Sequence, residues 1–405
     1  MITPSFTLTA TERVLPRLAL DFTTASLDSR ITFTRSGATA TRVNSSGYVE
    51  TMAADTPRFD FDPVTVVCKG LLIEEARTNL RSYSEEFNNI VWVTSNASVS
   101  ANFVGITSPS GTQTADKLIL NNGSSAGNIV SSLVLISGTT YTYSCYAKAG
   151  ERNVVRLRII GIAGWASAAV NLSTGAVVSN VGTVVVSDAG GGWYRIAVTA
   201  TCDLTGTNAV YVYDQTGTTG NGSNGFYIWG AQVEAGSFST SFIPTVASQV
   251  TRTADVATMT STNFSDWYSA GAGGVVARVL PSTVSGTRPA LQFDDATANE
   301  VITLRGSTTN PELVIVDGGA PQAQIDAGTI AANTAYNLGA AWNTDNCAAA
   351  VNGGAAATDT AATIPTVTQA RLGSDGTNYL NGQLQTVRYW PQRIINAEVQ
   401  AFSKG

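Results

Sequence analysis

TYTYSCYAKA, residues 140–149, alternates along its length, so that tyrosine, cysteine and alanine share one side and mostly polar side chains share the other. A period of two residues is that of a β-strand with one buried face. NVVRLRIIG, residues 153–161, and NAVYVYD, residues 208–214, repeat the pattern with valine, leucine and isoleucine between arginines or tyrosines. These three segments predict half-buried strands.

Similar short runs continue along the chain between turn residues. The glycine-rich stretches at residues 190–192 and 216–225 favour turns over helices. The last third contains a second series: GGVVARVL, PALQFDD, EVITLRG, ELVIVDGG, YNLGAAWN, AAAVNGG and GQLQTVRYW. Only residues 396–404 predict a short helix, with Asn396 as its N-cap. We therefore expect an all-β protein built of multidomain antiparallel β-sandwiches.

Breaks in the pattern divide the chain into three expected parts. Residues 1–80 predict an N-terminal arm or small β domain, residues 81–247 a first sandwich and residues 248–405 a second. TNLRSYSEEFN and IPTVASQVTRTAD mark the two boundaries. We expect the apolar residues of the arm to need another surface, since so short a segment cannot bury them alone; they are Leu15, Leu18, Leu20 and Phe22.

Composition excludes several classes of function. The chain of 405 residues has no histidine, which removes the commonest general base and metal ligand. Its net charge of −6, without a basic run, argues against nucleic acid as a partner. Neither an export signal nor a membrane-spanning run is recognisable. The four cysteines stand singly and are expected as thiols, with a bridge between Cys145 and Cys202 left open.

An aromatic and basic surface is expected opposite the valine-rich faces of the three strands. Aromatic rings and planar guanidinium groups are the side chains that recognise sugars. The candidates on this surface are Tyr146, Arg156, Arg158, Tyr211 and Tyr213, together with Trp165 in the loop-like GIAGWASAA. The alternatives are an interface between protomers or an ordinary solvated sheet face, and for the tryptophan, packing over the sheet edge.

Carboxylate pairs offer the one enzymatic alternative. The pairs are Glu74 and Glu75, Glu85 and Glu86, and Asp294 and Asp295. Adjacent residues of a strand point to opposite faces, so no pair readily makes the facing geometry of about 5–9.5 Å that a glycosidase needs. We expect no enzymatic activity.

Three separated signatures resemble structural proteins of tailed phages and related gene-transfer particles. The first comprises TRSGATATR, PRFDFDP and GLLIEEARTNL. The second runs from FNNIVW and TADKL through YTYSCYAKAG and GGGWYRIAVTAT to FYIWGAQVEAGSFSTSFIPT, and resembles the jelly-roll carbohydrate-binding modules of phage fibres and xylanases. The third, NYLNGQLQTVRYWPQRIINAEVQAFSK, is similar to the last strand and terminal helix of concanavalin A-like lectin/glucanase sandwiches.

The resemblance implies a virion fibre or spike, on head or tail, that adheres to host cell-surface polysaccharide. It further implies a homotrimer, with the N-terminal segment contacting other virion proteins. Trp193 and Trp229 match structural positions of the resembled modules, and Trp390 is expected beneath the terminal helix. A decoration protein without glycan binding is the alternative, and a glycan-cleaving depolymerase is a more distant one.

Jelly-roll modules of this kind often hold a structural calcium ion through carboxylate and backbone oxygens. By that resemblance, Glu74, Asp116 and Glu234 are the calcium candidates in this chain. We expect no other cofactor.

Overall fold

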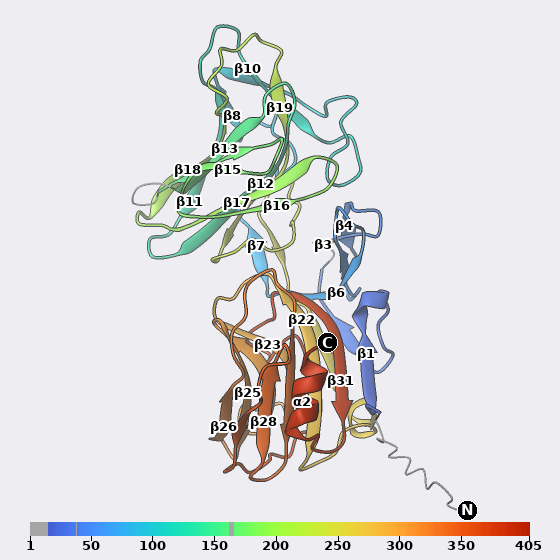
Figure 1. The fold of residues 1–405 in the computed structure, drawn as a ribbon. Helices are drawn as coiled ribbons and strands as arrows, with labels where there is room; N and C mark the ends of the chain where they lie inside the picture. Colours follow the sequence, from blue (N-terminus) through green and yellow to red (C-terminus); the bar gives the residue numbers. More distant parts are fainter. Residues whose placement is uncertain (1–14, 38, 162–165) are drawn as a thin grey trace, which may run out of the picture.

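The computed structural model describes residues 15–37, 39–161 and 166–405. Within these residues the strands form two antiparallel β-sandwiches that lie end to end in an elongated molecule (Figure 1). We call the one formed by β8 to β19 the middle sandwich. The other, the terminal sandwich, contains strands from both ends of the chain. The predicted all-β class and sandwich architecture are confirmed.

Two six-stranded sheets enclose the apolar core of the middle sandwich in the described residues. One sheet, the covered sheet, has the order β16-β17-β12-β19-β10-β9; the other, the open sheet, has the order β15-β14-β13-β18-β11-β8. The covered sheet comprises β9 (Ala97–Ser100), β10 (Asp116–Leu120), β12 (Thr140–Lys148), β16 (Thr183–Asp188), β17 (Trp193–Thr201) and β19 (Gly225–Ala235). The open sheet comprises β8 (Val93–Ser95), β11 (Asn128–Leu135), β13 (Val154–Ile160), β14 (Ala166–Asn171), β15 (Val177–Val181) and β18 (Gly206–Asp214).

The terminal sandwich packs an eight-stranded sheet against a seven-stranded one, again in the described part of the chain. The first sheet has the order β29-β28-β27-β22-β31-β6-β5, with β1 also paired to β31. Its strands are β1 (Leu18–Asp21), β5 (Phe59–Phe61), β6 (Cys68–Ile73), β22 (Gly273–Pro281), β27 (Tyr336–Trp342), β28 (Cys347–Val351), β29 (Ala357–Asp359) and β31 (Gly382–Trp390). The second has the order β2-β21-β30-β23-β24-β25-β26. Its strands are β2 (Thr32–Thr34), β21 (Val256–Thr260), β23 (Thr287–Asp294), β24 (Val301–Ser307), β25 (Asn310–Asp317), β26 (Ala320–Asp326) and β30 (Gln369–Leu372).

Two small pairs of strands lie where the sandwiches meet. The β3–β4 hairpin (Ala40–Val43 and Val49–Met52) projects from the terminal sandwich toward the middle one, and β7 (Arg77–Asn79) pairs with β20 (Val250–Arg252) (Figure 1). The β7–β20 pair therefore places the segment that leads into the middle sandwich next to the segment that leads out of it.

The first eighty residues do not form the separate arm or small domain that we expected. Their strands complete both sheets of the terminal sandwich, because β1 and β6 pair with β31, and β2 pairs with β21. Leu18, Leu20 and Phe22 are buried in the core of the terminal sandwich, whereas Leu15 is 80% exposed. Three of the arm's four apolar residues are thus buried against strands from the last 150 residues of the same chain.

Gly70 shows how closely these distant segments approach each other. It lies in β6 with φ of +114°, where a Cβ atom would stand 2.4 Å from the carbonyl oxygen of Leu384 in β31. Only glycine fits that backbone conformation and that gap. The glycine of the GLLIEEARTNL signature is therefore required by sheet packing.

The expected tryptophan and helix positions are found. Trp193 and Trp229 are buried, and the Trp390 ring stacks on Phe402 of α2 with centroids 4.9 Å apart. The helix α2 spans Asn396–Ser403, but Ile395 occupies its N-cap position, so the prediction of Asn396 as the cap is wrong by one residue. Two shorter helical turns are η1 (Phe22–Thr24) and α1 (Thr262–Ser265). None of the helices in the described residues is long and apolar enough to cross a bilayer.

All four cysteines are free thiols. The Cys145 thiol donates to the carbonyl oxygens of Tyr146 and Trp229, while the Cys202 thiol donates to those of Gly161 and Leu204. The bridge between Cys145 and Cys202 that the sequence left open is therefore not formed.

Replacing Leu18 by alanine tests the assignment of the N-terminal strand to the terminal core. We expect Leu18→Ala to lower the free energy of unfolding by about 2–5 kcal/mol, since it leaves a cavity in a packed core. Leu15→Ala is the matched control, because that side chain is exposed and its loss should change stability by less than about 0.5 kcal/mol. Chemical denaturation measures both; equal effects of the two substitutions would contradict the assignment.

Candidate functional site

A cluster of buried charges lies at the joint between the sandwiches. Arg58 contacts Glu74 at 2.8 Å and also pairs with Asp255, while Arg252 contacts Glu74 at 2.6 Å and Arg35 contacts Asp255 at 3.3 Å. The side chains of the three arginines and Asp255 have no exposed surface, and that of Glu74 has 7%. Such ion pairs persist in a protein interior only when each charge has several partners.

The carboxylate of Glu74 links the two sandwiches. It accepts hydrogen bonds from the backbone nitrogen and the Oγ of Ser241, at 2.8 and 2.7 Å, and Ser241 lies on the chain that leaves the middle sandwich. Burial by itself would raise the pKa of Glu74, but Arg252, Arg58 and the Ser241 bonds together lower it to about 2. Glu74 therefore stays ionised at neutral pH.

A third carboxylate balances the charge of the cluster. Glu234 of β19 acts electrostatically on Arg252 and accepts from the backbone nitrogen of Thr240 at 2.9 Å and from its Oγ1 at 2.7 Å. Three arginines thus face three carboxylates. Because Glu234 belongs to the middle sandwich and Glu74 to the terminal one, the cluster spans the joint.

Part of this cluster comes from the first signature of the sequence analysis. Arg35 lies in TRSGATATR, Arg58 in PRFDFDP and Glu74 in GLLIEEARTNL. Arg252 and Asp255, which complete it, lie in VTRTAD. Of the five cluster residues, sequence reasoning had named only Glu74 as a candidate. The signal available for Arg252 and Asp255 was two charged residues close together in a chain that is only 13% charged.

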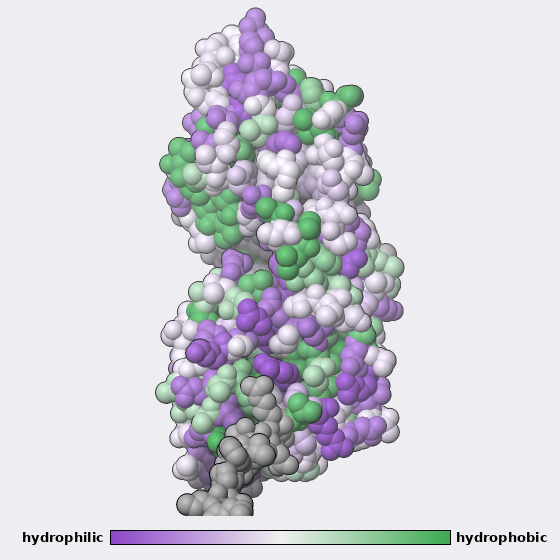
Figure 2. All heavy atoms as spheres, turned by 45° about the vertical axis from the view of Figure 1, so that its right-hand side comes forward, coloured by the Kyte–Doolittle hydropathy of each residue, from purple (hydrophilic) through white to green (hydrophobic). Residues whose placement is uncertain are grey.

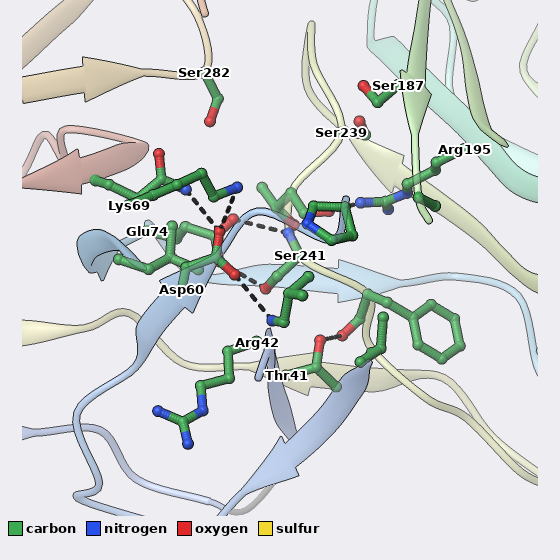
Figure 3. Close-up of a pocket in the computed structure, with 18 of the residues that line it drawn as sticks. Thr41, Arg42, Asp60, Lys69, Glu74, Ser187, Arg195, Ser239, Ser241 and Ser282 are labelled. Carbon is green, nitrogen blue, oxygen red and sulfur yellow. Dashed lines mark hydrogen bonds and ion pairs between the residues drawn. The ribbon is translucent and has the colours of Figure 1, made fainter. Parts of the chain in front are cut away.

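A pocket of about 250 Å³ opens beside the cluster, between the β3–β4 hairpin, the covered sheet and the loops of the terminal sandwich. Figure 3 shows Lys69 pointing toward Asp60, and Arg195 entering from the side of the middle sandwich. Lys69 contacts Asp60 at 2.8 Å, and Arg195 donates to the carbonyl oxygen of Thr240 at 2.6 Å and to Ser144 at 3.0 Å. The charged groups of this pocket are thus held by other groups of the protein, as expected of a joint.

Tyr146 does not lie on an open surface. The outer face of the covered sheet is buried against the joint, and Tyr146 packs on Trp229 and Phe242 with 5% of its surface exposed. The guanidinium of Arg195 lies over its ring at 5.4 Å from the centroid. Strand alternation alone could not distinguish a face covered by linker and hairpin from one facing solvent.

Four of the predicted residues do come together on the other sheet. Arg156 and Arg158 of β13 stand directly beside Tyr213 and Tyr211 of β18 in the antiparallel register. All four are partly exposed, while the residues between them face the core. The two tyrosine rings stack with centroids 5.1 Å apart and 13° between their planes. We call these four residues the open face.

The open face lies at the centre of its sheet, because β13 and β18 are the two middle strands of the six. Arg156 donates through Nη2 to the Oγ of Ser179, at 3.0 Å, on strand β15. Its side chain therefore lies across Ala169 of the intervening strand β14. Burial raises the pKa of the Tyr213 hydroxyl, and the neighbouring Arg158 opposes that shift through a hydrogen bond and its charge. Trp165, the sixth candidate, lies outside the described residues.

The three calcium candidates do not form one site. Glu74 and Glu234 are bonded within the joint, and Asp116 lies in β10, where its oxygens accept from the backbone nitrogens of Phe87 and Asn102 at 2.8 Å each. Burial raises the pKa of Asp116 to about 6, against those two bonds. In the described residues no three acidic or cysteine side chains gather as metal ligands.

Comparison with known proteins gives only partial structural likenesses. No family model matches it, and no curated protein does. Solved structures that superpose on part of it include the CBM40 module of the Ruminococcus gnavus IT-sialidase bound to alpha2,3 sialyllactose, with a TM-score of 0.31, 14% identity, and 35% of this chain and 86% of that one covered. The binding domain of botulinum neurotoxin serotype D gives a TM-score of 0.29 and 13% identity, covering 37% of this chain and 40% of that one.

A mutant of NanB sialidase from Streptococcus pneumoniae gives a TM-score of 0.31 with 15% identity, covering 35% of this chain and 26% of that one. At these scores the neighbours decide nothing about a site. The strand order and the buried ion pairs themselves define the class of protein: it consists of two antiparallel β-sandwiches that are joined by a buried ion cluster.

Replacing Glu74 by glutamine tests the role of the joint. We expect Glu74→Gln to lower stability at pH 7 by about 3–5 kcal/mol, because it leaves buried arginines short of a partner. Since the pKa of Glu74 falls from 4.5 to about 2 on folding, its contribution is present above pH 4.5 and is lost as the pH falls toward 2. Denaturant unfolding between pH 7 and pH 2 should therefore show a smaller loss of stability in the variant than in the unmodified protein.

Glu75→Gln is the matched control for this experiment, because the Glu75 side chain is 33% exposed and pairs with Arg77. We expect it to change stability by less than about 1 kcal/mol. A Glu74→Gln variant with the unmodified pH profile would show that the cluster does not hold the joint.

Proposed function

We propose that this protein is an adhesive module that binds surface polysaccharide through the open face. The observation that supports this most directly is the juxtaposition of two stacked tyrosines and two arginines at the centre of an exposed sheet. Aromatic rings contact the C–H face of a sugar, and guanidinium groups donate to its oxygens. A flat sheet face suits an extended polymer better than a small molecule that needs a deep cavity.

We further propose, from the resemblance of the three signatures, that the module belongs to a phage virion as a fibre or spike on head or tail. Repetition on a particle makes a shallow site useful, because each bound copy raises the effective concentration of its neighbours at the polymer. A decoration role without glycan binding is the competing proposal. Binding to polysaccharide, or its absence, separates the two.

Attachment without cleavage is part of this proposal. The adjacent carboxylates that sequence reasoning weighed as catalytic groups include Glu74, in the joint, and Asp294, which Arg371 and Gln292 contact at 2.8 Å each. Arg252, Arg58 and Ser241 lower the pKa of Glu74 to about 2, so this carboxyl group is a poor general acid at neutral pH.

The apolar residues Leu18, Leu20 and Phe22 of the N-terminal segment are buried within one chain, so a homotrimer cannot use these three side chains as its interface. We propose that the trimer interface is formed by β15 and β16, which are edge strands of their sheets in the described structure. Residues 176–188 carry no lysine, arginine or proline, the residues that usually protect an exposed edge. Four valines there are 44–59% exposed: Val177, Val178, Val181 and Val185. Figure 2 shows further apolar groups, in green, on the surface of the middle sandwich.

Alanine substitution of the stacked tyrosines tests glycan binding. We expect Tyr211→Ala and Tyr213→Ala each to weaken binding to host polysaccharide about tenfold, or about 1.4 kcal/mol, through lost ring contact. Tyr48→Ala is the control, because Tyr48 is 42% exposed and lies outside the open face. Binding of purified protein to immobilised polysaccharide measures the effect. Unchanged binding by both variants would remove the open face as the site.

A lysine at the sheet edge tests self-association. We expect Val178→Lys to reduce the mass of the protein in solution to that of one chain, because a charge on the edge strand opposes pairing with another copy. Val246→Lys, at a position 64% exposed in the linker, should leave the mass unchanged. Light scattering after size separation gives the mass. An unmodified protein of single-chain mass would refute the trimer.

A further inference from the structure

We propose that the pocket at the joint is a second binding site, which takes one neutral sugar unit. The proposal does not depend on the open face, because the pocket lies against the other sheet of the middle sandwich. It rests on a juxtaposition: hydroxyl and amide side chains from both sandwiches and from the linker line a pocket whose charged groups are already paired within the protein.

The charges that line the pocket balance one another. The lining includes three cations and three carboxylates: Arg42, Lys69, Arg195, Asp60, Glu74 and Asp188. Arg42 pairs with Glu50 at 2.7 Å, and Asp188 accepts from the backbone nitrogen of Gly190 at 2.9 Å. The other four are bonded to one another, to the ion cluster or to the linker. An ionic ligand would therefore meet no unpaired opposite charge among these residues, so the site suits a neutral one.

Neutral polar groups of the pocket keep their hydrogen-bonding capacity. Figure 3 shows Ser282, which follows β22, on one side of the pocket, and Ser187 of β16 with Ser239 of the linker on the other. Their hydroxyl groups make no hydrogen bond within the described residues, and neither does the side-chain amide of Asn333, which also lines the pocket. Hydroxyl and amide groups each donate and accept. They therefore match the hydroxyl groups of a sugar, which do the same.

An apolar part of the lining completes the match. Tyr146 and Phe242 meet edge to face with 6.3 Å between their ring centroids, and both line the pocket. Val43 and Leu72 add aliphatic surface. A sugar has an apolar C–H side as well as hydroxyl groups, and aromatic or aliphatic surface beside hydrogen-bonding groups contacts both. The lining therefore favours a sugar over a ligand that is polar on every side.

The polar side of the pocket is ordered before a ligand binds. Asp60 of β5 accepts from the backbone nitrogen of Val43 at 2.9 Å and from Nε2 of Gln383 at 2.9 Å. Lys69 of β6 adds a third contact at 2.8 Å. The Lys69 ammonium has three N–H groups and Gln383 retains its Oε1 acceptor, so both can also bond a ligand. Groups that are already held lose little side-chain entropy on binding.

The volume of the pocket limits the ligand to one ring. At about 250 Å³ it lies just below the range of about 300–1,000 Å³ in which drug-sized ligands bind. Thr41 of the β3–β4 hairpin donates to the carbonyl oxygen of Phe242 at 2.5 Å, which ties two walls of the pocket to each other. A single sugar unit, free or at the end of a chain, therefore fits, whereas an extended polymer suits the open face.

Free monosaccharides test this site in the full chain. The probes are glucose, galactose, mannose and their N-acetylamino derivatives, each at about 10 mM, which is above the ~1 mM dissociation constant of a weak site. We expect saturation-transfer NMR to detect binding of at least one of these six sugars. The uronic acid and the free amino sugar of the same configuration should bind at least tenfold more weakly, because their charges have no partner in the pocket.

Two substitutions address the pocket itself. Ser282→Phe fills it and should abolish binding of the sugar. Asn333→Gly should weaken binding about fivefold through one lost hydrogen bond, and glycine readily adopts the φ of +55° found at this position. Asn102→Gly is the matched control, because Asn102 is also exposed, has a φ of +48° and lies outside the pocket. It should bind the sugar as the unmodified protein does.

Tyr211→Ala separates this site from the open face and should leave monosaccharide binding unchanged. The pocket is overturned as a sugar site if none of the six sugars binds, or if Ser282→Phe and Asn333→Gly bind as the unmodified protein does. Binding that is lost in Tyr211→Ala would instead assign the sugar to the open face. None of these results decides whether the open face binds polysaccharide, which is measured on the polymer.

Discussion

The ion cluster of Arg35, Arg58, Arg252, Glu74 and Asp255 holds together segments that lie far apart in the chain. These groups are buried, and a group that lost its partner would be an unpaired charge in a region without water, which is strongly destabilising. That cost makes the arrangement of the joint specific, since a displaced sandwich would expose or isolate charges rather than slide over an apolar surface. The β7–β20 ribbon and the bonds from Ser241 to Glu74 lie in the same place. The relative position of the two sandwiches therefore depends on this cluster.

The joint also determines which surface of the middle sandwich is available. The covered sheet turns its outer face toward the β3–β4 hairpin, the linker and the loop between β9 and β10, which together bury Tyr146 and Trp229. The open sheet turns its outer face away from them, and its arginines and tyrosines stay accessible to solvent. The two sheets have similar alternating sequences, so their difference arises from what the rest of the chain places against them.

The first signature of the sequence has a structural role at the joint. TRSGATATR, PRFDFDP and GLLIEEARTNL supply Arg35, Arg58 and Glu74 to the joint, and Gly70 to the close approach of β6 and β31. These three segments thus connect the first eighty residues to Arg252, Asp255 and β31 in the last part of the chain. The middle sandwich is held on this support in a fixed orientation, with its open sheet directed away from the joint.

Composition and the alternation of apolar and polar residues by themselves determined the fold class and the faces of several strands. The period-two pattern fixed the all-β class, the burial of Val155, Leu157 and Ile159, and the common face of Arg156, Arg158, Tyr211 and Tyr213, because side-chain direction in a strand follows from backbone geometry alone. Only the tertiary structure decided that β1, β2, β5 and β6 belong to the last sandwich, and that Tyr146 is covered. The pairings of β1, β2 and β6 join residues more than 200 positions apart, and Tyr146 is covered by Phe242 of the linker. A strand's own sequence shows which side is apolar but not which distant segment will bury it.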